Sequence, residues 1–267
     1  MSRYDMSEFE WRIIQPLLPS KPREVARVDD RRVLNGIFWA LRSGSPWRDL
    51  PERYGQYTTC YNRFRRWTKA GVWDRIMDAI TDAYEGDVRM IDGTSVRVHH
   101  SAATLKKPPG SMSWTKALLS ACLGRQSKGR GGLTTKIHAL TDGEGLPVKF
   151  VITPGNTHDI QAAAELLADI RPGQMVLGDK AYDANWLRDY VAERGGWANI
   201  PPKSLRKSPI CFSPWLYKQR NLVERFFNKL KYFRRIATRY DKLGSAFSAM
   251  VKLACIRIRL RHYESTA

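Results

Sequence analysis

The sequence predicts an α/β protein in which an all-helical N-terminal domain precedes a mixed sheet flanked by helices. Apolar residues recur at intervals of three and four through the first 85 residues, which is the helical period. From Val88 onward, β-branched and apolar segments are divided by Gly, Pro and Asp-Gly, and later alternate with helical segments. A chain of 267 residues is long enough for two domains with real cores. We place the boundary between residues 85 and 86.

Three helices are predicted in residues 1–85. They lie over EWRIIQPLL, over DRRVLNGIFWALR and from Thr58 or Thr59 to Gly71. Either Asp29 or Asp30 can cap the second helix, and Gly44–Pro46 ends it. These elements form the expected helical domain.

The third of these helices is rich in arginine. Three short helices ending in a basic one resemble a helix-turn-helix, so this domain is expected to bind DNA. The side chains expected to contact DNA are Arg63, Arg65, Arg66 and Lys69. The alternative is a small helical bundle whose third helix is amphipathic, with Tyr61, Phe64 and Trp67 packed inward.

The second domain, residues 86–267, is predicted to begin with a meander of strands. Strands are expected over VRMIDGTSVRVHH, GLTTKIHALTD, LPVKFVITPG, QMVLGDKAYD and WANIPP. Helices are expected over THDIQAAAELLADI, capped at Thr157, over ANWLRDYVAERGG, over Tyr217–Arg235 and over Ser245–Arg261. Residues 103–130 are predicted to be a variable loop, and KSLRKSPICFSPW has no clear periodicity and is also expected to be a loop.

The net charge is +19 and the pI is near 10.0. Residues 203–262 contain sixteen basic side chains and only two acidic ones, which favours a polyanionic partner such as nucleic acid over a basic surface kept for solubility. No apolar run approaches the ~18 residues of a membrane span, and the first residues do not resemble a signal peptide. Four scattered cysteines argue against zinc and against disulfides, so a cytoplasmic location is expected.

Two aspartates follow apolar runs that are expected to be buried strands. Asp92 follows VRMI, and Asp179 follows MVLG. An unpaired carboxylate there costs several kcal/mol, and a divalent cation such as Mg²⁺ would offset that cost. Simpler alternatives stay open, because Asp92-Gly93 is also typical of a tight hairpin turn and Asp179 can be a turn residue before a helix.

A third acid, Glu224, lies alone in the basic segment YKQRNLVERFFNKLKYFRR. On a wheel of about 100° per residue, Tyr217, Arg220, Glu224 and Lys231 share one face, opposite an apolar stripe. The simpler alternative is a solvated face with an ordinary Arg–Glu pair at i,i+4. A carboxylate among cations stays ionised and able to bind a metal ion, while the cations around it suit phosphates.

The spacing Y-(2)-R-(3)-E-(6)-K of these four residues resembles the signature of bacterial insertion-sequence transposases of the DDE class. The segments MIDGTSVRVHHSAATLKK, RGGLTTKIHALTDGEGLPVKFVITPGNTHD, VLGDKAYD and RNLVERFFNKLKYFRRIATRYDK are similar to the insertion sequence five family. RRVLNGIFWALRSGSPWRDLPERYG and YNRFRRW resemble the helical N-terminal region of that family. The resemblance covers nearly the whole chain and fades at Ala103–Arg130.

The resemblance implies an RNase H-like catalytic domain with a D-D-E triad at Asp92, Asp179 and Glu224, all three of which would bind metal. It implies two Mg²⁺ ions, replaceable by Mn²⁺. It further implies contacts of Tyr217, Arg220 and Lys231 with DNA phosphates. His158, in the matching GNTHD motif, is either structural or close to the site, and Lys180 and Asp183 are expected to be structural.

The implied activity is transposition. Such an enzyme binds the terminal inverted repeats of its element, cleaves the element ends and transfers the 3′-hydroxyl ends to target DNA. Its expected partners are double-stranded DNA and a second copy of the chain in the DNA-bound complex, associated with the bacterial nucleoid. The alternatives are an inactive DNA-binding relic or repressor, and an RNase H-like DNA nuclease.

Overall fold

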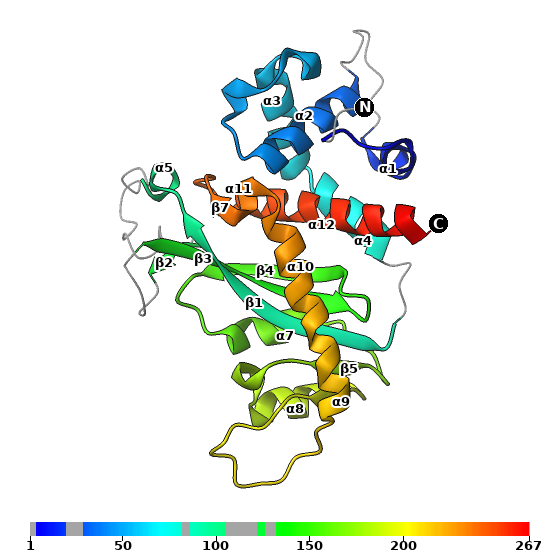
Figure 1. Ribbon diagram of the computed structural model, residues 1–267, viewed down its shortest axis with the longest axis vertical. Coiled ribbons are helices and arrows are strands. Elements are labelled where there is room, and N and C mark those ends of the chain that lie inside the picture. Colours follow the sequence, from blue (N-terminus) through cyan, green and yellow to red (C-terminus); the bar gives the residue numbers. More distant parts are fainter. Residues whose placement is uncertain (1–3, 20–28, 82–85, 105–121, 126–131, 267) are drawn as a thin grey trace. The chain divides into compact units, whose positions relative to one another are not determined.

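The computed structural model describes residues 4–19, 29–81, 86–104, 122–125 and 132–266. The chain divides into two compact units (Figure 1). The first comprises Met1–Ala83, His99–Thr104 and Leu230–Ala267, and the second comprises Tyr84–Val98 and Leu105–Lys229. This division differs from a single boundary at residue 85, because the C-terminal helix groups with the N-terminal helices.

The first unit is almost entirely helical. Its main elements are α1 (Glu8–Ile14), η1 (Gln15–Leu17), α2 (Asp30–Ser43), η2 (Trp47–Asp49), η3 (Glu52–Tyr54), α3 (Tyr57–Lys69), α4 (Val72–Thr81), α5 (His100–Ala103), α11 (Arg234–Ala237), β7 (Thr238–Arg239) and α12 (Gly244–Thr266). The Asp29 side chain accepts a hydrogen bond from the Arg31 amide and caps α2, and Gly44 ends α2 with a φ of 72°. The predicted helical N-terminal region is confirmed.

The helix α12 contacts α1, α2, α3 and α4, and most of it is buried. Arg257 and Arg259 lie inside this core, and the Arg257 Nε is 3.1 Å from Oε1 of the buried Glu10. Burial lowers the pKa of Arg257 to about 10, although the Glu10 carboxylate opposes the shift. Nearly all residues from Phe247 to Leu260 are buried, so α12 is covered on all sides by the other elements of this unit.

The second unit is built on a mixed sheet. Its strands are β1 (Val88–Val98), β2 (Gly124–Arg125), β3 (Leu133–Asp142), β4 (Pro147–Pro154), β5 (Met175–Leu177) and β6 (Trp197–Asn199). β1, β3 and β4 form an antiparallel meander, while β5 and β6 join β1 in parallel, giving the order β2-β3-β1-β5-β6 with β4 also on β3. β1 runs straight through Asp92 and Gly93, which pair with Ala139 and His138, so the hairpin alternative is wrong.

The helical elements of this unit are η4 (Asp159–Ala162), α7 (Ala163–Leu166), η5 (Lys180–Tyr182), α8 (Asn185–Ala192), α9 (Pro214–Tyr217), η6 (Lys218–Arg220) and α10 (Asn221–Lys231), whose last two residues group with the first unit. α7 and α8 cover one face of the sheet, where Ile91, Val176 and Leu187 share a buried cluster. No described helix is long and apolar enough to cross a membrane.

Two predicted helices are shorter than expected. The segment after β4 forms only η4 and α7, and His158 rather than Thr157 precedes it, with no side-chain cap. The segment predicted as one helix over Tyr217–Arg235 is interrupted by η6 and by an extended Phe233. The variable loop predicted at 103–130 lies largely outside the described residues, although Gly124–Arg125 pairs with β3.

Candidate active site

The first carboxylate, Asp92, lies near the middle of β1. Successive side chains of a strand point to opposite faces, so Asp92 faces away from the cluster that contains its neighbour Ile91. Its Oδ1 accepts a hydrogen bond from the Gly93 amide at 2.8 Å, and its Oδ2 accepts one from Arg220 Nη2 at 2.9 Å. Burial raises the pKa of Asp92, and the Arg220 charge opposes the rise.

The second carboxylate, Asp179, follows β5. β1 and β5 pair in parallel with Met90 opposite Leu177, so Asp92 and Asp179 each lie two residues beyond that pair. Parallel strands bring their carboxyl ends to one edge, which places the two aspartates next to each other. Asp179 precedes η5, and its Oδ1 accepts a hydrogen bond from the Ala181 amide at 2.8 Å.

The third carboxylate, Glu224, lies in the first turn of α10. Arg220 Nη1 donates to Glu224 Oε1 at 2.8 Å, and the same guanidinium bonds to Asp92. Arg220 therefore joins two acids that are far apart in the sequence. The Tyr217 ring lies 6.0 Å from the Arg220 guanidinium carbon. The structure thus brings Tyr217, Arg220 and Glu224 to the strand that contains Asp92.

The chemistry of these residues fits a divalent cation. Carboxylate oxygens are the ligands that hard cations prefer. Two buried polar atoms beside them, Arg220 Nε and the Tyr182 hydroxyl, form no hydrogen bond with the described residues. Burial, together with the charges of Asp159, Asp92 and Asp179, raises the pKa of Tyr182. No three acids, histidines or cysteines in the described ranges are gathered closely enough to hold a metal ion, and Arg220 occupies the space between Asp92 and Glu224.

The GNTHD motif brings a residue to this region that sequence reasoning missed. His158 is exposed, whereas Asp159 lies against Gly93 and contacts Lys136 and His138. The signal available in the sequence was the acid of the GNTHD motif, which follows the end of β4 at Pro154 by five residues.

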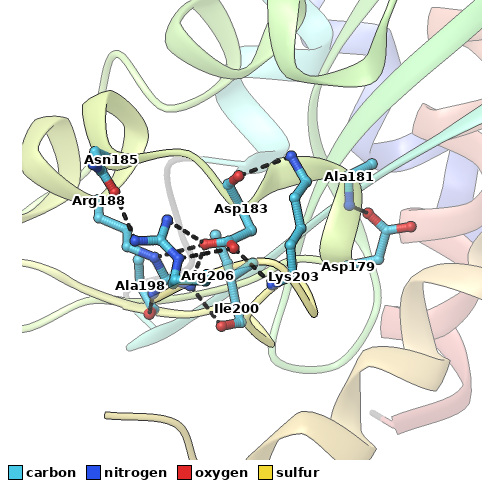
Figure 2. Close-up of polar contacts among 9 residues, drawn as sticks. All are labelled: Asp179, Ala181, Asp183, Asn185, Arg188, Ala198, Ile200, Lys203 and Arg206. Carbon is cyan, nitrogen blue, oxygen red and sulfur yellow. Dashed lines mark hydrogen bonds and ion pairs between the residues drawn. The ribbon is translucent and has the colours of Figure 1, made fainter. Parts of the chain in front are cut away.

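A second polar cluster surrounds Asp183, four residues after Asp179 (Figure 2). The Asp183 side chain is 1% exposed and accepts five hydrogen bonds, from Arg188, Arg206 and the Lys203 amide. Burial alone would raise the pKa of Asp183, but these donors lower it to about 2. Arg188 also donates to the Ala198 and Ile200 carbonyls, so the cluster ties α8 to the loop after β6.

The remaining residues with expected roles are in the first unit. Lys231 is exposed at the end of α10. In α3, Arg65, Arg66 and Lys69 are exposed, while Phe64 and Trp67 are buried as expected for an amphipathic helix. Arg63 is buried and its guanidinium bonds to Asp30, so its side chain is not presented to a DNA surface. The prediction that Arg63 contacts DNA is therefore wrong.

The mixed sheet with helices on its faces is that of an RNase H-like domain. A family model described as "Transposase DDE domain" matches residues 83–259, and one described as "Putative transposase of IS4/5 family" matches residues 6–77. The chain belongs to the DDE transposase family of insertion sequences.

Two curated bacterial relatives agree with this assignment, and one solved structure has a similar fold. The chain is 42% identical over 130 residues to the "Putative transposase for insertion sequence element IS6501" of Brucella ovis, covering 48% of this chain and all of the relative. It is 32% identical over 132 residues to the transposase for insertion sequence element IS1106 of Neisseria meningitidis, covering 46% of this chain and 45% of the relative. Among solved structures, piggyBac transposase, in a synaptic complex with hairpin DNA, superimposes with a TM-score of 0.50 at 12% identity. That match covers 98% of this chain and 74% of the other, and it supports the fold alone.

Proposed function

We propose that the chain cleaves the ends of its insertion sequence and joins them to target DNA, with Asp92, Asp179 and Glu224 as the catalytic carboxylates. The observation that carries the proposal is the Arg220 guanidinium, which bonds to Asp92 and Glu224 at 2.9 and 2.8 Å. These acids come from a strand and a helix that are distant in the sequence. Their approach through Arg220, with Asp179 two residues beyond the parallel strand pair that also precedes Asp92, supports a shared role in phosphoryl transfer on DNA.

The three carboxylates would hold two Mg²⁺ ions, or Mn²⁺ in their place. Bound there, the ions would activate water or a 3′-hydroxyl as the nucleophile and stabilise the leaving oxygen of an in-line displacement. Arg220 bonds to carboxylate oxygens of Asp92 and Glu224 that would otherwise be open to a cation. Arg220 has a planar fork that suits a phosphate as well as a carboxylate, so it is able to exchange one for the other.

The DNA contacts are divided between two sets of residues. Tyr217, Arg220 and Lys231 would bind phosphates next to the scissile bond, and the exposed Arg65, Arg66 and Lys69 of α3 would contact the terminal inverted repeat. Joining two element ends requires both in one complex, so we propose a homodimer on DNA. The large excess of basic residues after position 202 supplies the electrostatic attraction.

The test measures cleavage, in the presence of Mg²⁺, of a labelled DNA duplex that contains one end of the insertion sequence in which the gene lies. Glu224→Gln should bind this duplex as the wild type does and cut it at least about 10³-fold more slowly, because a carboxylate at the reacting centre is lost. Glu165→Gln, which alters an exposed acid in α7, is the matched control and should cut normally. Undiminished cutting by Glu224→Gln would refute the third carboxylate, and wild-type protein that binds but never cuts would favour a relic or repressor. Structure-selective cutting without end joining would identify a nuclease.

A further inference from the structure

The carboxylate of Asp159 lies directly against the backbone of β1 at Gly93, the residue that follows Asp92. A Cβ atom at position 93 would collide with Asp159 Oδ1 and would lie 3.2 Å from His138 Nδ1. Glycine is therefore required here for a close approach between a strand and a carboxylate. This contact is separate from the hydrogen bonds of Asp92 with Gly93 and Arg220.

Two side chains of β3 hold Asp159 in this position. Lys136 Nζ donates to Asp159 Oδ2 at 3.2 Å and to the Thr157 carbonyl at 3.0 Å. His138, which is fully buried and pairs with Gly93 across the strands, places its Nδ1 at 3.4 Å from Asp159 Oδ1. Its Nε2 is fixed by the Thr153 hydroxyl at 2.8 Å. Burial alone would raise the pKa of Asp159, but His138 and Lys136 lower it, so the carboxylate stays charged.

The direction of these side chains decides what Asp159 can do. Side chains alternate along a strand, so Asp92 projects from one face of β1, and the position of a Cβ at Gly93 points to the other. Asp159 contacts β1 on the second face, behind Asp92. The charges of Asp159 and Asp92 both raise the pKa of the fully buried Tyr182, whose hydroxyl makes no hydrogen bond with the described residues. Asp159 therefore contacts the backbone of β1 at Gly93, on the face opposite to the Asp92 carboxylate.

We propose that Asp159 is a positioning residue for Asp92, acting through its contact with Gly93 to fix the first carboxylate of the active site. The inference rests on the proposed cation-binding role of Asp92. A residue that merely neutralised Lys136 would not need to touch Gly93, and the exposed pair Lys149–Asp169, at 2.8 Å, shows such an arrangement elsewhere in the unit. Supporting residues of metal sites commonly change metal affinity by about 10- to 100-fold when altered.

The experiment is a Mn²⁺ titration of the full chain without DNA, followed by electron paramagnetic resonance of the free ion. Asp159→Asn and Gly93→Ala should each weaken Mn²⁺ binding by about tenfold or more while circular dichroism stays unchanged. The double variant should be no weaker than the weaker single variant, because both changes break one contact. Asp169→Asn, which removes a lysine-paired aspartate elsewhere, should bind Mn²⁺ as the wild type does.

Two outcomes would overturn the inference and one would remove its basis. Wild-type affinity in Asp159→Asn, with weakened binding in Asp92→Asn, would leave the proposed function standing and refute the positioning role. Additive losses in the double variant would also refute it, since two independent contacts would then be involved. If Asp92→Asn itself bound Mn²⁺ as the wild type does, the proposed cation site would fail and the inference with it. Asp159→Ser, which leaves no unpaired amide, replaces the Asn variant if that variant does not fold, with the same expectations.

Discussion

Asp179 and Asp183 lie four residues apart in one segment, yet their surroundings are opposite. Both oxygens of Asp183 are used, by two arginines and a backbone amide, and the side chain is closed off from solvent (Figure 2). Asp179 accepts one hydrogen bond, from the Ala181 amide, and lies beside Asp92. Burial raises the pKa of Asp92. A carboxylate whose two oxygens are both hydrogen-bonded stabilises the fold, whereas one that accepts a single hydrogen bond has an oxygen left to bind a ligand.

The largest effect is expected at the first carboxylate of the site. Asp92→Asn should lower DNA cleavage by about 10³-fold or more, because the amide cannot replace a charged ligand at the reacting centre. Its thermal unfolding midpoint should change little, since burial disfavours the charged form of Asp92. Parallel cleavage and melting measurements check this, and a large loss of stability with normal cleavage would place Asp92 with the structural carboxylates.

Asp183→Asn should show the reverse pattern. Losing the charge leaves Arg188 and Arg206 without their shared carboxylate, which costs about 3 kcal/mol in the free energy of unfolding. Asp189→Asn, which alters an exposed acid in α8 next to Arg188, is the control and should change stability by less than about 0.5 kcal/mol. Chemical denaturation measures the free energy of unfolding of both variants. Equal values for the two variants would contradict the structural role of Asp183.

The same cluster predicts a pH dependence of stability. The folded pKa of Asp183 is about 2, below the ordinary value of 3.8, so its contribution is complete above pH 4 and is lost as the pH falls toward 2. The free energy of unfolding of the wild type should therefore decrease through that window, and Asp183→Asn should lack this part of the decrease. Denaturation curves at pH 5, 4 and 3 measure it, and parallel pH profiles for the two proteins would argue against the cluster.

Arg220 offers an intermediate test, because it fills the space between two acids of the site. In Arg220→Ala, Asp92 and Glu224 lose their shared guanidinium, and without added metal the stability should fall by about 1 kcal/mol. Mn²⁺ should raise the melting temperature of this variant more than that of the wild type, since the competing cation is gone. An equal response to Mn²⁺ in both proteins would show that the guanidinium and the metal do not share oxygens.

The smallest effect is expected at an exposed pair. Asp169→Asn breaks the contact with Lys149, but the Asp169 side chain is 82% exposed, and such surface pairs contribute about 0–1 kcal/mol. Its stability and cleavage should match those of the wild type. A loss comparable to that of Asp183→Asn would show that burial does not separate structural carboxylates from surface ones.

Much of the site could be predicted from the sequence because the carboxylates follow apolar strands. Asp92 and Asp179 were identifiable from the VRMI and MVLG runs, and Glu224 from its place as the lone acid on the cationic face of a predicted helix. The pairing of Arg220 with Asp92 was not predictable, because it depends on where α10 crosses the sheet. Asp159 was missed for a similar reason, since only the register that places His138 opposite Gly93 shows what its carboxylate touches.

The fold was predictable where local patterns decide it. Strand alternation and the caps at Asp29 and Gly44 indicated the elements correctly. The grouping of α12 with the N-terminal helices was not predicted, because the sequence of a helix that is buried on all sides does not indicate which elements cover it. The loop after β6 had no periodicity, and its order comes from Lys203 and Arg206 binding Asp183, which is a tertiary contact.

The most direct test compares Asp179→Asn and Asp183→Asn in one cleavage assay at a temperature where both are folded. Asp179→Asn should melt like the wild type and fail to cut the duplex that carries the element end. Asp183→Asn should melt at a lower temperature and still cut. If Asp179→Asn cut as the wild type does, or if only Asp183→Asn lost cleavage while folded, the assignment of the two carboxylates would be contradicted.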